Sequence, residues 1–330
     1  MPDAGRRRGD RPAGGPGQTT SDGTATAPLW LRAAPFVFLL LWSGGYSVAK
    51  IGLRHAEPMT LLALRYGLAL VLLLPVALVQ RPPPPRRRAD WGHLAVVGFL
   101  IQVVYFGLCY IAMKQGTSAG NVALIVSLQP ILVALLAPRL GGEPVGGAGW
   151  AGLGLGLAGA ALVIASRSTL AAGSPLGLLA ATGALAGMTA ASLYEKRFGG
   201  GQHPVTANLV QYVVGFVVLL PWAVATERLQ VDWTFGLIGA LAYLVIGNSL
   251  ISTTLLLAMI RRGEVARVSA LFFLVPPAAA LIAWAVLGEA MTGLAWVGLV
   301  LAALGVALAS RRRTARAGGP GLRALWQGRN

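Results

Sequence analysis

The sequence predicts an all-α integral membrane protein with ten transmembrane helices arranged as two inverted five-helix repeats. Composition is the first reason: 55% of the 330 residues are apolar and 12% are charged, whereas an ordinary soluble domain is about 25% charged. So little charge leaves too few polar side chains to cover a soluble globule. The second reason is a series of ten long apolar segments, and the third is a match between the two halves of the chain.

Ten segments are long enough to cross the hydrocarbon core of a bilayer. They cover residues 33–53, 59–79, 92–113, 117–138, 147–166, 176–197, 205–226, 235–258, 264–287 and 291–310. Most connections are short, as expected for a compact helical bundle. The connection from Arg81 to Trp91 is an exception, because its four consecutive prolines cannot continue a helix and predict a stiff connector.

Two basic tails flank the spans, residues 1–28 and 311–330. The first has almost no large apolar side chains and is expected to be disordered. If ten crossings start from a cytoplasmic N-terminus, 20 of the 27 Lys and Arg residues lie on the cytoplasmic side and 5 on the other. This asymmetry predicts a multi-pass protein of the plasma membrane with both termini in the cytoplasm. The net charge of +16 then belongs to the membrane surface, and no nucleic-acid partner is expected.

The two halves match at an offset of 146 residues without a gap. Matches that are rare by chance include Lys50 with Lys196, Tyr66 with Tyr212, Pro130 with Pro276, Glu143 with Glu289, and Trp150 with Trp296. Each half holds five spans, an odd number, so the second half enters the membrane from the opposite side. Inverted repeats of this kind are the architecture of many secondary transporters.

Other functions are less compatible with the sequence. A channel or lipid scramblase would need polar stripes along several helices, whereas the polar residues cluster near mid-depth. An intramembrane enzyme would need an acid–base pair, a nucleophile or a metal cluster at matched depth. The single cysteine, Cys109, and the three histidines at loops or span ends do not supply one. We therefore expect no cofactor, no metal and no enzymatic activity.

Three stretches resemble the EamA-type domain of the drug/metabolite transporter superfamily. LLWSGGYSVAKIGLRHAEPMTLLALRYGLAL (40–70) is similar to the opening of such a domain. SLQPILVALLAPRLGGEPVGGAGWAGLGLGLAGAALVIAS (127–166) and FLVPPAAALIAWAVLGEAMTGLAWVGLVLAALGVALAS (273–310) are similar to two domain ends. In each end, a mid-helix proline is followed by Gly-Glu and a glycine-rich last span.

The resemblance implies two EamA-like repeats, residues 33–166 and 176–310, that surround a central cavity. It also implies a carrier that exports or imports small metabolites or drugs, amino acids or similar compounds, and of the two directions we expect export. The partners are then a small-molecule substrate and the lipid bilayer. Small residues at four-residue spacing, such as Gly152 and Gly156, permit close helix contact within the bundle or in a homo-oligomer.

Arg65 is the charged residue that most needs an explanation, because it lies six residues inside the second span. A charge at mid-depth costs at least about 2.5–3.5 kcal/mol. One interpretation is a fixed positive charge that attracts an anionic or zwitterionic substrate. The alternative is a side chain that extends to the outer interface. No carboxylate lies at mid-depth, and Glu195 at the end of a span is the nearest, so the energy coupling stays open.

Neutral polar and aromatic residues cluster at mid-depth and are candidates for the cavity wall. Trp42 and Tyr46 share one face of the first span at i and i+4. The full set of predicted substrate-binding residues is Trp42, Ser43, Tyr46, Arg65, Gln102, Tyr105, Asn121, Ser127, Gln129, Asn248 and Ser252. For any one of the neutral residues, a hydrogen bond to a neighbouring helix is the alternative. Pro130 and Pro276 are predicted kinks and candidate hinges, because proline removes a backbone donor.

Overall fold

The computed structural model describes residues 29–136, 139, 146–167, 174–198, 202–252 and 291–317, together with 255, 275, 278–279, 281–282 and 284–288. The regular elements in this part of the chain are all helical. Six helical segments within it are long and apolar enough to span a membrane. The predicted tail 1–28, most of the predicted span 264–287, and the predicted hinge Pro276 lie outside the described residues.

Helix boundaries lie close to those predicted in most spans. In chain order the helices are α1 (Leu29–Gly52), α2 (Pro58–Gln80), α3 (Arg88–Gly98), η1 (Phe99–Tyr105), α4 (Phe106–Lys114), α5 (Ala119–Val126), α6 (Gln129–Leu136), α7 (Gly147–Arg167), α8 (Pro175–Phe198), α9 (Pro204–Thr226), α10 (Phe235–Ala242), η3 (Tyr243–Ser252) and α13 (Gly293–Ala317). Helix α13 continues past residue 310 into the predicted basic tail.

The predicted span 117–138 is divided into two helices. Helix α5 ends at Val126, and α6 begins at Gln129, directly before Pro130. Pro130 has no backbone N–H, and its ring would clash with the carbonyl one turn earlier in a regular helix. The interruption therefore occurs where the sequence predicts a kink.

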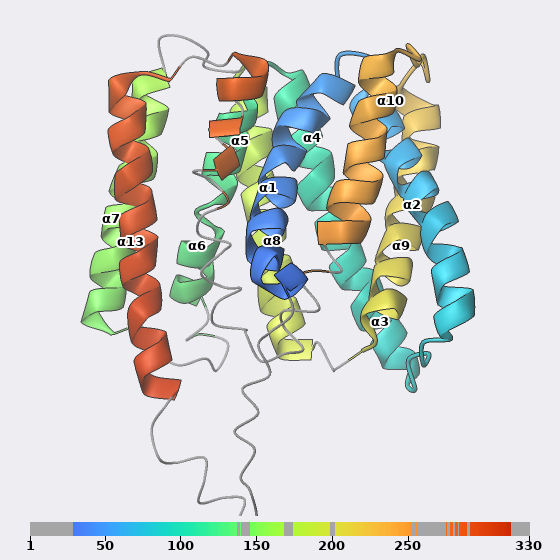
Figure 1. The fold of residues 1–330 in the computed structure, drawn as a ribbon, viewed down its shortest axis with the longest axis horizontal. Helices are drawn as coiled ribbons and strands as arrows, with labels where there is room; N and C mark the ends of the chain where they lie inside the picture. Colours follow the sequence, from blue (N-terminus) through green and yellow to red (C-terminus); the bar gives the residue numbers. More distant parts are fainter. Residues whose placement is uncertain are drawn as a thin grey trace, which may run out of the picture.

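Helices α2 and α9 pack side by side and contact each other at both ends (Figure 1). At one end, the Glu227 carboxylate that follows α9 accepts hydrogen bonds from the backbone N–H groups of Met59 and Thr60 at 2.9 and 2.8 Å. At the other end, the Thr206 hydroxyl at the start of α9 donates to the Pro83 carbonyl after α2 at 3.3 Å. The N-terminus of each helix therefore lies beside the C-terminal end of the other.

Residues that match in the sequence repeat also meet in space. The rings of Tyr66 and Tyr212 lie 5.6 Å apart across the α2–α9 contact. Thr60 and Thr206, which hold the two helix starts, are another matched pair. A two-fold axis between antiparallel α2 and α9 would produce these contacts.

Helices α7 and α13 form a second pair at the opposite edge of the molecule (Figure 1). Their backbones approach so closely that a Cβ atom on Gly159 would overlap the backbone of Ala302 and Gly298. A Cβ on Gly305 would likewise overlap the backbone of Gly156. The small residues predicted to permit close helix contact therefore pack within the chain.

Candidate functional site

Two π-helical segments lie in the centre of the molecule at matching places in the repeat. Segment η1 spans Phe99–Tyr105, and η3 spans Tyr243–Ser252, which overlaps η1 after a shift of 146 residues. Widened helical turns are uncommon and are frequent at functional sites. Both segments contribute a side chain to the same cavity.

This cavity lies between α1, α2, η1, α4 and η3. Its free volume is about 20 Å³, enough for about one water molecule. The lining side chains therefore fill most of the space between these helices. The lining residues are Trp42, Gly45, Tyr46, Ala49, Arg65, Tyr105, Phe106, Cys109, Tyr110, Met113 and Asn248.

Arg65 points into the bundle and does not extend to the interface, since it is 2% exposed. Its guanidinium donates to the Ser249 hydroxyl from Nε and Nη2, both at 3.3 Å, and to the Tyr110 hydroxyl from Nη1 at 3.2 Å. The guanidinium carbon also lies 4.6 Å from the centre of the Phe106 ring. Every one of these described partners is neutral.

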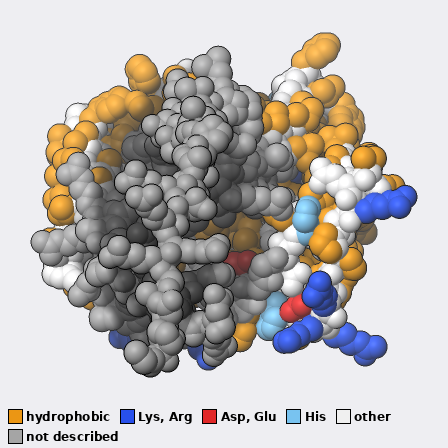
Figure 2. Space-filling view, turned by 60° about the horizontal axis from the view of Figure 1, so that its bottom comes forward, with side chains coloured by type: hydrophobic (Ala, Val, Ile, Leu, Met, Phe, Trp, Pro, Cys, Tyr) orange, Lys and Arg blue, Asp and Glu red, His pale blue; other side chains and the backbone are white. Residues whose placement is uncertain are grey.

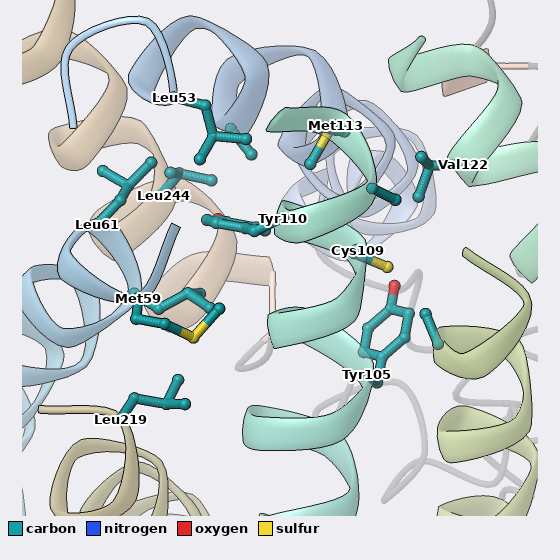
Figure 3. Packing of buried hydrophobic residues seen from close by; sticks show 14 of the residues in the cluster. Leu53, Met59, Leu61, Tyr105, Cys109, Tyr110, Met113, Val122, Leu219 and Leu244 are labelled. Carbon is teal, nitrogen blue, oxygen red and sulfur yellow. The ribbon is translucent and has the colours of Figure 1, made fainter. Parts of the chain in front are cut away.

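Two tyrosines join opposite walls of the cavity. The hydroxyls of Tyr46 in α1 and Tyr105 in η1 are 2.7 Å apart. Cys109, one turn after Tyr105, also faces the cavity. In Figure 3, Tyr105 and Cys109 lie on one side of their helix, and Tyr110 extends from the other side toward α2. Aromatic side chains therefore surround the positively charged group.

Asn248 is the residue that the second half of the chain contributes to the lining. It is 7% exposed, and its amide lies against Gly45, where a Cβ atom would overlap Nδ2. At the neighbouring Gly44, a Cβ would overlap the Tyr243 hydroxyl, which donates to the carbonyls of Leu40 and Leu41. The glycine pair in α1 thus permits the close approach of η3.

The cavity gathers five of the predicted substrate-binding residues: Trp42, Tyr46, Arg65, Tyr105 and Asn248. The other six lie outside its lining: Ser43, Gln102, Asn121, Ser127, Gln129 and Ser252. Two of these six join elements: Gln129 donates to Ser192 in α8 at 2.8 Å, and Ser252 donates to the Phe38 carbonyl at 3.5 Å.

Three of the six keep a buried oxygen without a hydrogen-bond partner among the described residues. These atoms are Ser43 Oγ, Gln102 Oε1 and Asn121 Oδ1. The Gln102 backbone carbonyl does accept a hydrogen bond from the Tyr66 hydroxyl at 2.9 Å. These three groups are buried in the bundle but are not part of the cavity lining.

Sequence reasoning missed several residues of the site, chiefly on α4. Phe106, Cys109, Tyr110 and Met113 follow Tyr105 at helical spacing. The periodicity from Tyr105 through Cys109 to Met113 marks a single face, and this signal was available in the sequence. Ser249 lies next to Asn248 in the chain, but nothing local indicates that it binds Arg65.

Within the described part of the chain, no group of three or more His, Cys, Asp or Glu side chains is placed to hold a metal ion. The cavity lining itself offers groups for binding: one cation, one amide and several aromatic faces. Such a set can recognise a small solute with a polar end and an apolar body.

Comparisons with known proteins agree with a transport role. The model of the EamA-like transporter family matches residues 31–165 and again 175–311. An uncharacterized transporter of Synechocystis is 27% identical, over 84% of this chain and 88% of that protein. The uncharacterized inner membrane transporter YedA of Escherichia coli K12 is 24% identical, over 84% and 90%. The "Probable amino-acid metabolite efflux pump" of the same strain is 25% identical, over 81% and 90%.

A solved crystal structure covers 86% of this chain and 99% of its own, with a TM-score of 0.60 and 19% identity. At that identity the likeness concerns the fold alone. The family match extends over most of the chain, and the names of the relatives indicate transporters rather than enzymes. The chain belongs to the EamA-like transporter family and is a multi-pass membrane transporter.

Proposed function

We propose that the protein is a carrier that exports small organic metabolites across the plasma membrane by alternating access. The proposal includes ten transmembrane helices in two inverted five-helix repeats, residues 33–166 and 176–310. The observation that supports it best is the buried charge of Arg65 at a cavity to which both halves contribute. A charge kept inside the membrane region is costly and marks a functional site.

The contacts between the halves support an exchange between two similar packings. Helices α2 and α9 contact each other reciprocally, and the matched Tyr66 and Tyr212 rings touch between them. Two inverted halves give two nearly equivalent arrangements, one open to each side of the membrane. The small free volume of the cavity, about 20 Å³, fits a state in which the site is closed around its own side chains. Pro130 and Pro276 are the proposed hinges.

Two relatives provide the reason for proposing export. Proteins of Escherichia coli and Salmonella typhimurium, each 25% identical, are named "Probable amino-acid metabolite efflux pump". From these names we take only a broad substrate class for this chain, namely a small organic metabolite with a polar end. The single arginine and the aromatic wall are compatible with that class.

Counterflow in proteoliposomes tests the carrier mechanism. Vesicles that hold the purified protein are loaded with an unlabelled solute and diluted into a trace of the same labelled solute. The solutes tested are amino acids, organic acids, nucleobases, sugars and cationic drugs. A carrier accumulates label transiently inside, because the exit of unlabelled solute drives the entry of labelled solute. Label that only equilibrates would indicate a channel and contradict the proposal.

The cavity wall is tested with a double variant. Replacing Trp42 and Tyr46 together with Ala should abolish counterflow without reducing expression, because both side chains line the cavity. The control is Trp222→Ala, since Trp222 is 46% exposed on α9 and is not part of the lining. Normal counterflow in the double variant would place the transport site elsewhere.

A further inference from the structure

We infer that the substrate is a small organic monocarboxylate with an apolar, preferably aromatic, body and without an ammonium group. This inference rests on the proposed carrier function and specifies the chemistry of the same site. It also separates the substrate from a zwitterionic amino acid and from a cationic drug. Three features of the molecule lead to it in three steps: the state of Arg65, the placement of the acids, and the character of the cavity walls.

The first step is that Arg65 lacks a charged partner among the residues that the structure describes. Its hydrogen bonds to Ser249 and Tyr110 are 3.2 and 3.3 Å long, at the weak end of the usual range. A guanidinium has five N–H donors, and three of them have partners here. A buried cation with neutral partners keeps a strong preference for an anion. The planar donor fork of arginine matches a carboxylate.

The second step is the placement of the acids along the chain. None of the cavity-lining residues is Asp or Glu. All eleven Asp and Glu residues lie in the N-terminal tail, in connections or at the ends of predicted spans: Asp3, Asp10, Asp22, Glu57, Asp90, Glu143, Glu195, Glu227, Asp232, Glu264 and Glu289. A substrate ammonium would therefore find no carboxylate at mid-depth. The positive Arg65 would repel it at short range, where the low dielectric strengthens repulsion.

The third step is the apolar character of the wall. Trp42, Tyr46, Tyr105, Phe106 and Tyr110 present rings to the cavity. Aromatic faces can attract a cation, but the Phe106 face is already occupied by the Arg65 guanidinium at 4.6 Å. The remaining rings suit an apolar body, and Asn248 offers one neutral amide. One positive charge also balances one negative charge, which favours a monoanion.

Four compounds with the same phenyl body test the inference. They are 3-phenylpropanoate, phenylalanine, phenethylamine and 3-phenylpropanol, which carry a carboxylate, both charges, an ammonium, and no charge. Binding to the full-length protein in lipid nanodiscs is measured by isothermal titration calorimetry. We expect 3-phenylpropanoate to bind at least about thirtyfold more tightly than the other three compounds. A difference of this size is typical when one partner of a buried charge pair is removed and the other is left unpaired.

Variants of Arg65 test which group reads the carboxylate. Arg65→Gln should lower the affinity for 3-phenylpropanoate at least about thirtyfold, and Arg65→Lys should retain part of it. The matched control is Arg54→Gln, because Arg54 is exposed at the end of α1 and the change in charge is the same. Melting curves of all three variants show whether they are folded.

Each outcome has a definite meaning. Equal or tighter binding of phenylalanine overturns the exclusion of an ammonium, and equal binding of the alcohol or the amine overturns the need for a carboxylate. An unchanged affinity for 3-phenylpropanoate in a folded Arg65→Gln variant overturns the assigned role of Arg65. A wild-type protein that does not bind 3-phenylpropanoate overturns it as well. Counterflow of a solute without a carboxylate would also reject the inference but leave the carrier function intact. Tight binding of 3-phenylpropanoate without counterflow of any solute would reject the carrier function alone.

Discussion

The hydroxyl pair of Tyr46 and Tyr105 joins α1 to η1 at the cavity, with the oxygens 2.7 Å apart. Both side chains belong to the lining, and so does Cys109, which is the single cysteine of the chain and is 1% exposed. A short hydrogen bond between opposite walls favours the closed arrangement by about 0.5–1.5 kcal/mol. Because Cys109 is buried in the same lining, its rate of alkylation would report how often the walls separate.

We predict that Tyr105→Phe increases the rate of Cys109 alkylation by a membrane-permeant maleimide about two- to tenfold. This factor corresponds to the free energy of the one hydrogen bond that the variant loses. The rate is followed by mass spectrometry of the intact protein. Tyr194→Phe is the control, because it removes a comparably short bond, 2.8 Å to His93, from a place outside this cavity. An equal rate in wild type and Tyr105→Phe would show that the tyrosine pair does not hold the cavity closed.

Helices in this protein are held together by backbone contact and by caps that come from distant segments. The α7–α13 pair depends on glycines, because at Gly159 and Gly305 the facing backbone leaves no room for a side chain. Helix α2 depends on Glu227, which accepts from the Thr60 hydroxyl at 2.7 Å in addition to two backbone N–H groups. Negative charge at a helix N-terminus is favourable because it balances the helix dipole.

For the α7–α13 pair, we predict that Gly159→Ala lowers the melting temperature in detergent. The new methyl group must separate two backbones, and overpacking of this kind costs about 1–3 kcal/mol. Gly154→Ala in the same helix is the matched control, since a Cβ there meets nothing within 4 Å and alanine favours a helix by about 0.5–1 kcal/mol. A Gly159→Ala variant as stable as Gly154→Ala would contradict the close packing.

For the cap of α2, we predict that Glu227→Gln destabilises the protein by about 1 kcal/mol, because it removes the charge and one acceptor from the helix N-terminus. The measurement is again thermal unfolding in detergent. Glu57→Gln is the control, because Glu57 precedes Pro58 but its side chain makes no capping bond in the described structure. Equal losses in the two variants would indicate a general charge effect instead of the specific cap.

The whole molecule has an apolar circumference and a basic end, as a membrane protein requires. Large apolar side chains of α2 and α9, such as Val79 at 84% exposed and Val217 at 61%, face outward where lipid would cover them. Lys and Arg side chains are visible on the face that Figure 2 brings forward, which is the bottom of Figure 1. Arg86, Arg87 and Arg88 are exposed in the connection from α2 to α3.

The distribution of basic residues predicts that a reporter fused after Asn330 is cytoplasmic. We expect a fused fluorescent protein that folds only in the cytoplasm to be bright, and a fused alkaline phosphatase to be inactive. A second pair of fusions in the connection after α9, at Leu229, should give the opposite result because the proposed topology places that connection outside. Matching signals at both positions would overturn the proposed topology.

The amino-acid sequence by itself determined the membrane class, most boundaries of the described helices, the break before Pro130, the repeat, and the family. These depend on hydropathy, length and proline chemistry, which are local properties of a segment. The tertiary structure decided which polar residues share the cavity, since this depends on the rotation of each helix about its axis. Arg65 thus meets Tyr110 and Ser249 instead of the interface, and Gln129 turns to Ser192. It also decided that Glu227, not the adjacent Glu57, caps α2, because that contact joins residues 168 positions apart.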